Sequence, residues 1–164
     1  GNFDFKVVTN LLRRVALKVN LRGDTLVFDT YDVRDGESPE ILAHKLYGNS
    51  ELHWIILLIN NITDRYHQWP KPYIQHLSYL NNKYPTAVKL NALHHYEISQ
   101  TSGDTTVKIN IGKDNTDFPS ATAITNVEFE DDLQEKQRLI RLLDPSYLPQ
   151  FVEEFEELME ESAI

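Results

Sequence analysis

The chain of 164 residues contains no cysteine. This excludes disulfide bridges and thiolate zinc sites, and nothing in the composition is typical of a small secreted scaffold held by bridges. Basic residues are also scarce, because 16 Lys and Arg stand against 25 Asp and Glu, for a net charge of −9. Binding to a phosphate backbone needs clustered Lys and Arg, so we expect no nucleic-acid partner. Proteins and sugars stay open as partners.

Long apolar runs are absent too. Six consecutive large apolar residues, Trp54 to Ile59, stand between polar neighbours. A membrane-spanning helix needs roughly 20 such residues, so this run indicates a buried core helix or an interface helix. No basic segment followed by an apolar core and a cleavage site is visible near the N-terminus, so we expect no signal peptide. The sequence therefore predicts no membrane partner.

Catalytic motifs are missing as well, since no HExxH, GxSxG or phosphate-binding loop is present. The densest histidine cluster is His94-His95-Tyr96-Glu97. On a strand, His94 and His95 point to opposite faces, which argues against a shared metal ion. The carboxylates are concentrated near the C-terminus, where a solvated helix face explains them. We expect no enzyme, no cofactor, no metal site and no small-molecule substrate.

Period-two alternation from Val15 to Leu21, a turn at Gly23-Asp24 and the β-prone stretch 25–33 predict a hairpin. Ser38-Pro39-Glu40 then predicts a helix start, and Gly48 its end. Asn49 or Ser50 caps a second helix, which contains the apolar run. Residues 31–62 are therefore predicted to form a strand and two helices.

Helical spacing from Tyr73 to Tyr84, with Pro85 as a stop, predicts a third helix. Stretches 94–98 and 105–111 form a second predicted hairpin around Gly103, with Val107, Ile109 and Ile111 on one face. Residues 112–126 are unpatterned and resemble a linker. The stretch 139–143 is a short apolar strand or helix. A last helix, predicted to begin at Pro149, has a stripe opposite its glutamates: Leu148, Phe151, Val152, Phe155, Leu158 and Met159.

Aromatic residues are the most informative candidates for binding. They are enriched at interface hot spots and also stack on sugar rings. Trp54 lies inside an apolar run and is first of all a core candidate. Tyr66 and Trp69 lie on a polar loop, and we therefore expect them to be exposed and to contact a partner.

The segment 31–49 resembles the first two-thirds of a LysM module. That family opens with a Tyr-x-Val strand, a Gly-Asp/Glu-Ser/Thr turn, a Leu-x-x-Ile-Ala helix and a second helix ending at Asn. The matching residues here are Tyr31, Val33, Gly36, Ser38, Leu42, Ala43 and Asn60 or Asn61. A standard module continues within a few residues with Pro-Gly and a second strand, whereas this chain continues with Tyr-His-Gln-Trp-Pro and another helix. The position of the second strand stays open.

A narrower resemblance covers residues 31–85. Leu-Tyr-Gly-Asn-x-x-Leu-x-Trp-Ile-Ile-Leu-Leu-Ile-Asn, followed by Asp-x-Tyr-x-x-Trp, is similar to the baseplate wedge proteins of T-even-type contractile-tailed phages, the gene product 53 family. The segment Glu135-Lys136-x-Arg138-x-Ile140 and the amphipathic last helix are similar too. The resemblance implies a structural protein without enzymatic activity that joins neighbouring wedges.

Together these observations predict an α+β chain with a LysM-like strand-helix-helix unit, an added hairpin, an extended linker and a C-terminal amphipathic helix. The expected segments are an N-terminal hairpin or extension (1–30), the LysM-like domain with its added helix and hairpin (31–111), the linker (112–127) and a C-terminal docking segment (128–164).

The expected role is that of a structural subunit of the virion's tail baseplate, assembled in the host cytoplasm. Its partners would be other wedge proteins and neighbouring wedges, with a LysM-type peptidoglycan-binding module as the alternative. We do not expect glycan binding, because the aromatic loop and the added helix displace the edge of a sugar groove. The last helix is predicted to dock on another wedge protein or copy rather than only on its own domain. The candidate partner-binding residues are Trp54, Leu58, Tyr66, Trp69, Tyr73, Phe151, Phe155 and Leu158.

Overall fold

The computed structural model describes residues 28–162, apart from the side chains of Leu158, Glu161 and Ser162. The chain divides into two compact units. Unit 1 comprises Gly1–Trp69 and Arg138–Ile164, and unit 2 comprises Pro70–Gln137. Unit 2 is therefore inserted into the sequence of unit 1, and the added hairpin and third helix belong to a different unit from the strand and two helices at residues 31–62.

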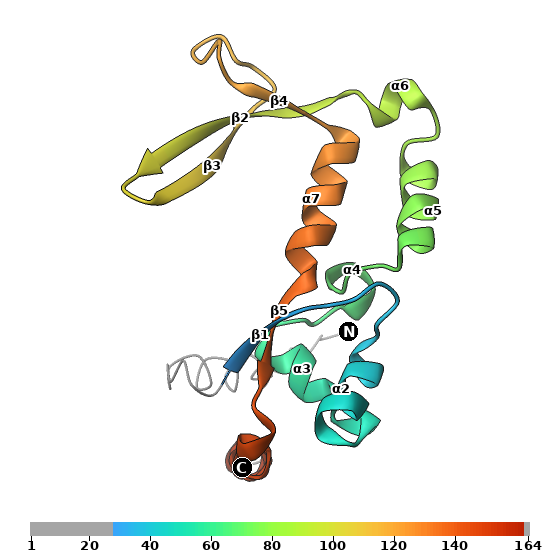
Figure 1. The fold of residues 1–164 in the computed structure, drawn as a ribbon, viewed down its shortest axis with the longest axis vertical. Helices are drawn as coiled ribbons and strands as arrows, with labels where there is room; N and C mark the ends of the chain where they lie inside the picture. Colours follow the sequence, from blue (N-terminus) through green and yellow to red (C-terminus); the bar gives the residue numbers. More distant parts are fainter. Residues whose placement is uncertain (1–27, 163–164) are drawn as a thin grey trace, which may run out of the picture. The chain divides into compact units, whose positions relative to one another are not determined.

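Unit 1 is a two-stranded antiparallel sheet with helices (Figure 1). Strand β1 pairs with β5 so that Tyr31 is opposite Ile140 and Phe28 is opposite Leu143. The described elements of unit 1 are β1 (Phe28–Asp32), α2 (Pro39–Tyr47), the 3-10 helix η1 (Ser50–Leu52), α3 (His53–Ile59), α4 (Arg65–Gln68), β5 (Leu139–Leu143), the 3-10 helix η2 (Pro145–Tyr147) and α8 (Leu148–Ser162).

The start of unit 1 folds as its local sequence predicts. The Ser38 hydroxyl accepts a hydrogen bond from the Ile41 N–H at 3.3 Å, and Pro39 occupies the first turn of α2. Gly48 ends α2 with a φ of 73°, a conformation that disfavours any residue with a Cβ. Asn49 caps the following turn, after which α3 begins at His53. The predicted strand and two helices are confirmed.

The core of unit 1 lies on two sides of α3. Ile56 packs in one cluster with residues of β1, α2 and β5. Ile55 and Ile59 pack in a second cluster with Leu143, against which α8 contributes Phe151 and Val152. Helix α3 is thus covered by its own unit on both sides, and α8 contributes to the second side together with residues of β1, α2 and β5.

Unit 2 combines helices with a three-stranded antiparallel sheet of order β3-β2-β4. Its elements are α5 (Tyr73–Lys83), α6 (Ala87–Leu90), β2 (Leu93–Ser102), β3 (Thr105–Gly112), β4 (Thr122–Thr125) and α7 (Asn126–Arg138), which ends in the first residue of the returning unit 1. The predicted third helix and second hairpin are confirmed. Ser102 pairs with Thr105, so Gly103 and Asp104 form a two-residue turn.

The stretch predicted as a linker differs from the expectation. Thr122–Thr125 form β4, which pairs with β2, and α7 follows at once. Thr125 and Glu128 form a reciprocal cap: the Glu128 carboxylate accepts from the Thr125 N–H at 2.8 Å, and the Thr125 hydroxyl accepts from the Glu128 N–H at 3.4 Å. This Thr-x-x-Glu signature was present in the sequence and marks the start of α7.

Two further expectations concern the ends of the chain. The first arm of the predicted 15–33 hairpin lies outside the described residues, and the described part of its second arm, β1, pairs with β5. The last helix begins at Leu148 rather than at Pro149. It follows β5 after only a short turn, η2, because Asp144 caps that turn by accepting from the Ser146 N–H. The last helix thus follows β5 of unit 1 directly, and residues 112–127 do not separate the two.

Candidate partner-binding surfaces

The start of α8 packs on its own unit. Its Phe155 ring lies 4.5 Å from the Trp54 ring and its Phe151 ring 6.3 Å from it, between centroids. Aromatic pairs at such distances stabilise by about 0.5–1.5 kcal/mol beyond the area that they bury. Trp54, Phe151 and Phe155 are each only half-buried, so they form one aromatic cluster with an exposed side. The Leu158 side chain lies outside the described residues, and Met159 is 41% exposed.

Leu58 and Trp69 lie in the core. Leu58 is 6% exposed and Trp69 is 7% exposed, so the expectation that Trp69 is exposed on its polar loop was wrong. The Trp69 indole N–H donates to the Glu37 carbonyl oxygen at 2.9 Å, which satisfies the polar edge of a ring buried against Ile56 and Leu142. The loop after α3 is therefore fixed to the turn between β1 and α2.

The Glu37 side chain closes the same turn. Its carboxylate accepts from Lys45 Nζ at 2.5 Å, from the Tyr31 hydroxyl at 2.9 Å and from the Arg34 N–H at 3.2 Å. Burial alone would raise the pKa of Glu37, but these hydrogen bonds and the Lys45 charge more than offset it and lower that pKa. Together with Trp69, this network makes the turn a rigid support for the loop around α4.

Tyr66 projects from that support. Asp64 caps α4 by accepting from the Tyr66 N–H at 3.0 Å, and Gln68 Oε1 accepts from the N–H groups of Thr63 and Asp64, both at 2.8 Å. Arg65 pairs with Glu40 of α2. The Tyr66 ring is 78% exposed, with the Arg65 guanidinium 5.9 Å from its centroid. An exposed aromatic ring on a fixed backbone loses little entropy on binding, which suits a protein contact.

In unit 2, α5 has one face buried and one exposed. His76 and Leu80 are buried, while Tyr73 is 59% and Ile74 72% exposed. The buried face is held by polar contacts to α7: His76 Nε2 lies 2.7 Å from Asp131 Oδ1, and Lys83 Nζ lies 2.6 Å from Glu130 Oε1. The hydrogen bond that the Lys83 ammonium donates to the Glu130 carboxylate raises the pKa of Lys83. The exposed face of α5 is a second candidate contact surface.

The histidine pair does not lie as expected. His94 Nδ1 and His95 Nδ1 are 2.7 Å apart, so the expectation that the two rings point to opposite faces was wrong. The register of β2 against β4 shifts between Leu93 and His95, which breaks the strict alternation of the strand. The His94 ring stacks on Phe129 at 3.9 Å, and His95 Nε2 lies 3.0 Å from Glu97 Oε1. The pair is thus fixed between β2 and α7.

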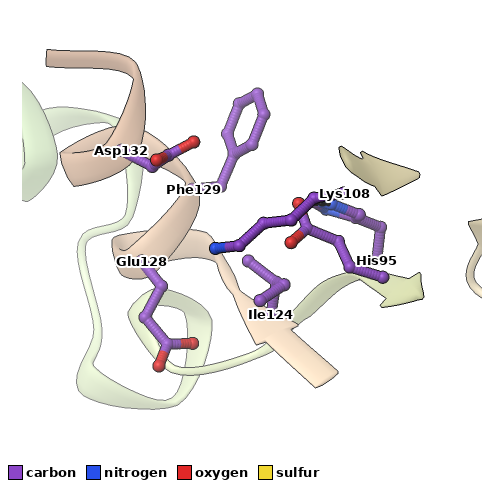
Figure 2. A pocket seen from close by; sticks show the side chains of 7 residues that line it. His95, Lys108, Ile124, Glu128, Phe129 and Asp132 are labelled. Atoms are coloured by element: carbon purple, nitrogen blue, oxygen red, sulfur yellow. Dashed lines mark hydrogen bonds and ion pairs between the residues drawn. The ribbon is translucent and has the colours of Figure 1, made fainter. Parts of the chain in front are cut away.

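A pocket of about 230 Å³ lies beside this pair. Figure 2 shows the Lys108 side chain extending from β3 across it toward α7, with Ile124 and Phe129 as apolar lining. His95, Glu97, Glu128 and Asp132 complete the lining. Within residues 28–162, no three His, Asp or Glu side chains are placed to hold a metal ion. No helix in that range has both the length and the hydropathy needed to cross a bilayer.

The chain is similar to known baseplate wedge proteins of phages. A family model described as base plate wedge protein 53 matches residues 8–102, which is more than half of the chain. The Baseplate wedge protein gp53 of Enterobacteria phage T4 is 40% identical over 40 residues, which is 24% of this chain and 20% of the T4 protein. The matched part therefore spans only about a fifth of that relative.

Proposed function

Because the chain belongs to the base plate wedge protein 53 family, we propose that it joins neighbouring wedges of a phage tail baseplate through protein–protein contacts. The family match is the observation that carries this proposal. It makes the chain a structural protein of the virion's tail baseplate, and we propose assembly in the host cytoplasm with other wedge proteins. Such a role requires exposed aromatic rings that can contact a partner, and buried residues beneath them that hold the backbone in place.

We also propose that unit 1 is a LysM-like unit with a divided sequence. The order of β1, α2, α3 and β5 is strand, helix, helix, strand, which is the order of that module. Unit 2 stands between α3 and β5 in the sequence, where a standard module has only a few residues. The antiparallel pairing of β1 with β5 supports β5 as the second strand.

Contacts to other wedge chains are proposed at two surfaces, one on each unit. On unit 1, Tyr66 and the exposed side of the Trp54, Phe151 and Phe155 cluster supply aromatic rings. On unit 2, Tyr73, Ile74 and Leu77 form the exposed face of α5. Leu58 and Trp69 support these surfaces from the core and would not touch a partner themselves.

Peptidoglycan binding is the alternative function. Trp69 joins the loop after α3 to the turn before α2, and the Arg65–Glu40 pair joins the same loop to α2. This favours a closed, structural unit. Pull-down of the purified chain on peptidoglycan at modest salt is expected to fail, and robust micromolar binding would favour the alternative.

Incorporation into particles tests the proposed function. A phage lacking the gene would be complemented with tagged protein, and the tag quantified in purified baseplates. We expect wild type to be incorporated and Tyr66→Asp to be reduced about tenfold, because a charge replaces a contact ring.

Ile41→Asp is the matched control, since Ile41 is an exposed apolar residue of the same unit, on α2. It should be incorporated like wild type. Absence of the wild-type chain from baseplates would refute the function, and equal incorporation of both variants would refute the role of Tyr66.

A further inference from the structure

The β2–β3 hairpin has features that its role within unit 2 does not explain. Nearly every residue of β3 is exposed, and β3 is one of the two edge strands of the order β3-β2-β4. β4 pairs only with the first half of β2, between Leu93 and Glu97, so beyond Glu97 the hairpin is two-stranded (Figure 1). Two-stranded hairpins are marginally stable in water without a further strand or a packed layer.

One face of this hairpin has three apolar side chains, Ile98, Val107 and Ile109, beside Gln100. Ile98 lies opposite Ile109, and Gln100 lies opposite Val107. Val107 is 54% and Ile109 37% exposed, and within residues 28–162 neither belongs to a buried cluster. Side chains of this kind on an edge strand are a liability unless something pairs with the edge.

The geometry of the turn determines which backbone N–H groups of β3 point away from β2 and can bind an added strand. Gly103 has a φ of 60° and is the first residue of the two-residue turn, so Ser102 and Thr105 form the hydrogen-bonded pair that closes it. The next pair, Thr101 and Thr106, is therefore a pair that does not exchange backbone hydrogen bonds. The N–H groups of Thr106 and Lys108 point away from β2, along the free edge.

From these observations we propose that β3 accepts an extended segment of a different baseplate chain as an added strand. The added strand hydrogen-bonds to the outward groups of Thr106, Lys108 and Asn110. Its apolar side chains lie on the face of Val107 and Ile109, and a carboxylate lies opposite Lys108.

Charge selects this occupant. Lys108 is the one charged residue of β3 and makes no ion pair with any described residue, although Glu97, Glu128 and Asp132 line the same pocket. An acidic residue on the added strand would form a cross-strand pair with it. A second copy of β3 paired about Lys108 would instead place two ammonium groups side by side, which is destabilising.

A matched pair of prolines tests the edge. The hydroxyls of Thr101 and Thr106 are 3.1 Å apart, so Thr101→Pro and Thr106→Pro each remove that contact. Each also removes one outward N–H, on the outer edge of β2 and of β3 respectively, and neither breaks the β2–β3 ladder. Amide exchange at Val107 and Ile109 in the purified variants verifies that the hairpin remains formed.

The readout is incorporation of the full chain into purified baseplates, so it rests on the proposed function. We expect Thr106→Pro to fall about tenfold and Thr101→Pro to remain within about twofold of wild type. Lys108→Glu should fall as well. Equal incorporation of the two proline variants, with wild type present in the particles, overturns the inference and leaves the proposed function standing. Absence of wild type refutes the function itself.

A photo-crosslinking residue at position 106 identifies the occupant in the same particles. The expected product links this position to one extended segment of another virion chain. A product formed only with a second copy of this chain would overturn the assignment to a different chain. The absence of any product, together with normal incorporation of Thr106→Pro, would overturn the added strand altogether.

Discussion

Each of the two units is stabilised internally by a different kind of interaction. Nearly all of the buried apolar residues lie in unit 1, where Ile55, Ile56 and Ala43 are completely buried, whereas unit 2 contributes Leu80. The buried polar residues show the opposite distribution: His76, His95, Glu130 and Gln134 belong to unit 2, and Glu37 to unit 1. Apolar burial depends little on pH, while charged pairs depend on it and on what else is nearby. The stability of unit 2 should therefore depend more on pH than that of unit 1.

A cavity in the apolar core of unit 1 should cause the largest loss of stability. Ile56→Ala removes a fully buried side chain from the centre of unit 1 and should lower the free energy of unfolding by about 2–5 kcal/mol. Urea denaturation measures the loss, and amide exchange localises it to α2, α3 and β5. Val88→Ala, at an 82% exposed position of unit 2, is the control and should change little. A loss below 1 kcal/mol would contradict an apolar origin of unit 1's stability.

The loss of one buried carboxylate should destabilise unit 2. Glu130 accepts from Lys83 and from the Tyr84 hydroxyl at 3.1 Å, so Glu130→Gln removes a charge-assisted pair inside unit 2. We expect a loss of about 1–3 kcal/mol, because the ammonium of Lys83 can still reach water. Faster amide exchange in α5 and α7, with unchanged exchange in α2 and α3, is the expected pattern. Asp104→Asn, at an exposed position in the turn between β2 and β3, is the control.

Substitutions in the cluster of Trp54, Phe151 and Phe155 test how firmly α8 is attached to the rest of unit 1. Phe155→Asp places a charge against Trp54 and should cost about 1–2 kcal/mol, below the value for a fully buried ring. The double variant Phe151→Asp and Phe155→Asp should destabilise unit 1. An isolated unit that stays fully folded would show that α8 is only loosely attached. Trp fluorescence reports the change directly, since Trp54 is the ring in contact.

Lowering the pH should destabilise unit 2 more than unit 1, and we expect this difference to be the smallest of the effects. Burial, together with the neighbouring His95, lowers the pKa of His94 below its ordinary value of 6.5. A base whose pKa is depressed by folding contributes stability above the ordinary value and loses it as the pH falls, because the unfolded chain then binds the proton. Unit 2 should weaken from about pH 6.5 downward, while Glu37 in unit 1 matters only below about 4.5. Amide exchange at pH 7 and pH 5 measures this, and His94→Phe should remove the difference.

Local signals predicted much of this fold. The Ser-Pro-Glu start and the Gly48 end of α2 are fixed by residues next to each other, and Gly103 with its flanking β-branched residues is enough for the hairpin. The pairing of β1 with β5 depends on contacts far apart in the sequence, which periodicity does not reveal. Trp69 misled for the same reason, because its buried partners Ile56 and Leu142 come from distant segments. For α7, the Thr125-x-x-Glu128 signature was available and would have placed its start.

The candidate surface was predicted less well than the fold. Tyr66 and Tyr73 are exposed as an interface residue must be, and Trp54 with Phe151 and Phe155 form contacts within the chain. Composition alone cannot separate an aromatic ring that supports a surface from one that is exposed on it, because both are enriched near interfaces.

The pairing of β1 with β5 also sets the order of events during synthesis. Asp32 must find Leu139 across the whole of unit 2, so the sheet of unit 1 has a high contact order. At a translation rate of about 5–20 residues per second, the stretch from α3 to the end of β5 takes about 4–17 s to emerge. During that time the apolar surface of α3 has neither β5 nor α8 to cover it. The growing chain thus passes through an aggregation-prone stage, and a chaperone that covers α3 would raise the yield of folded protein.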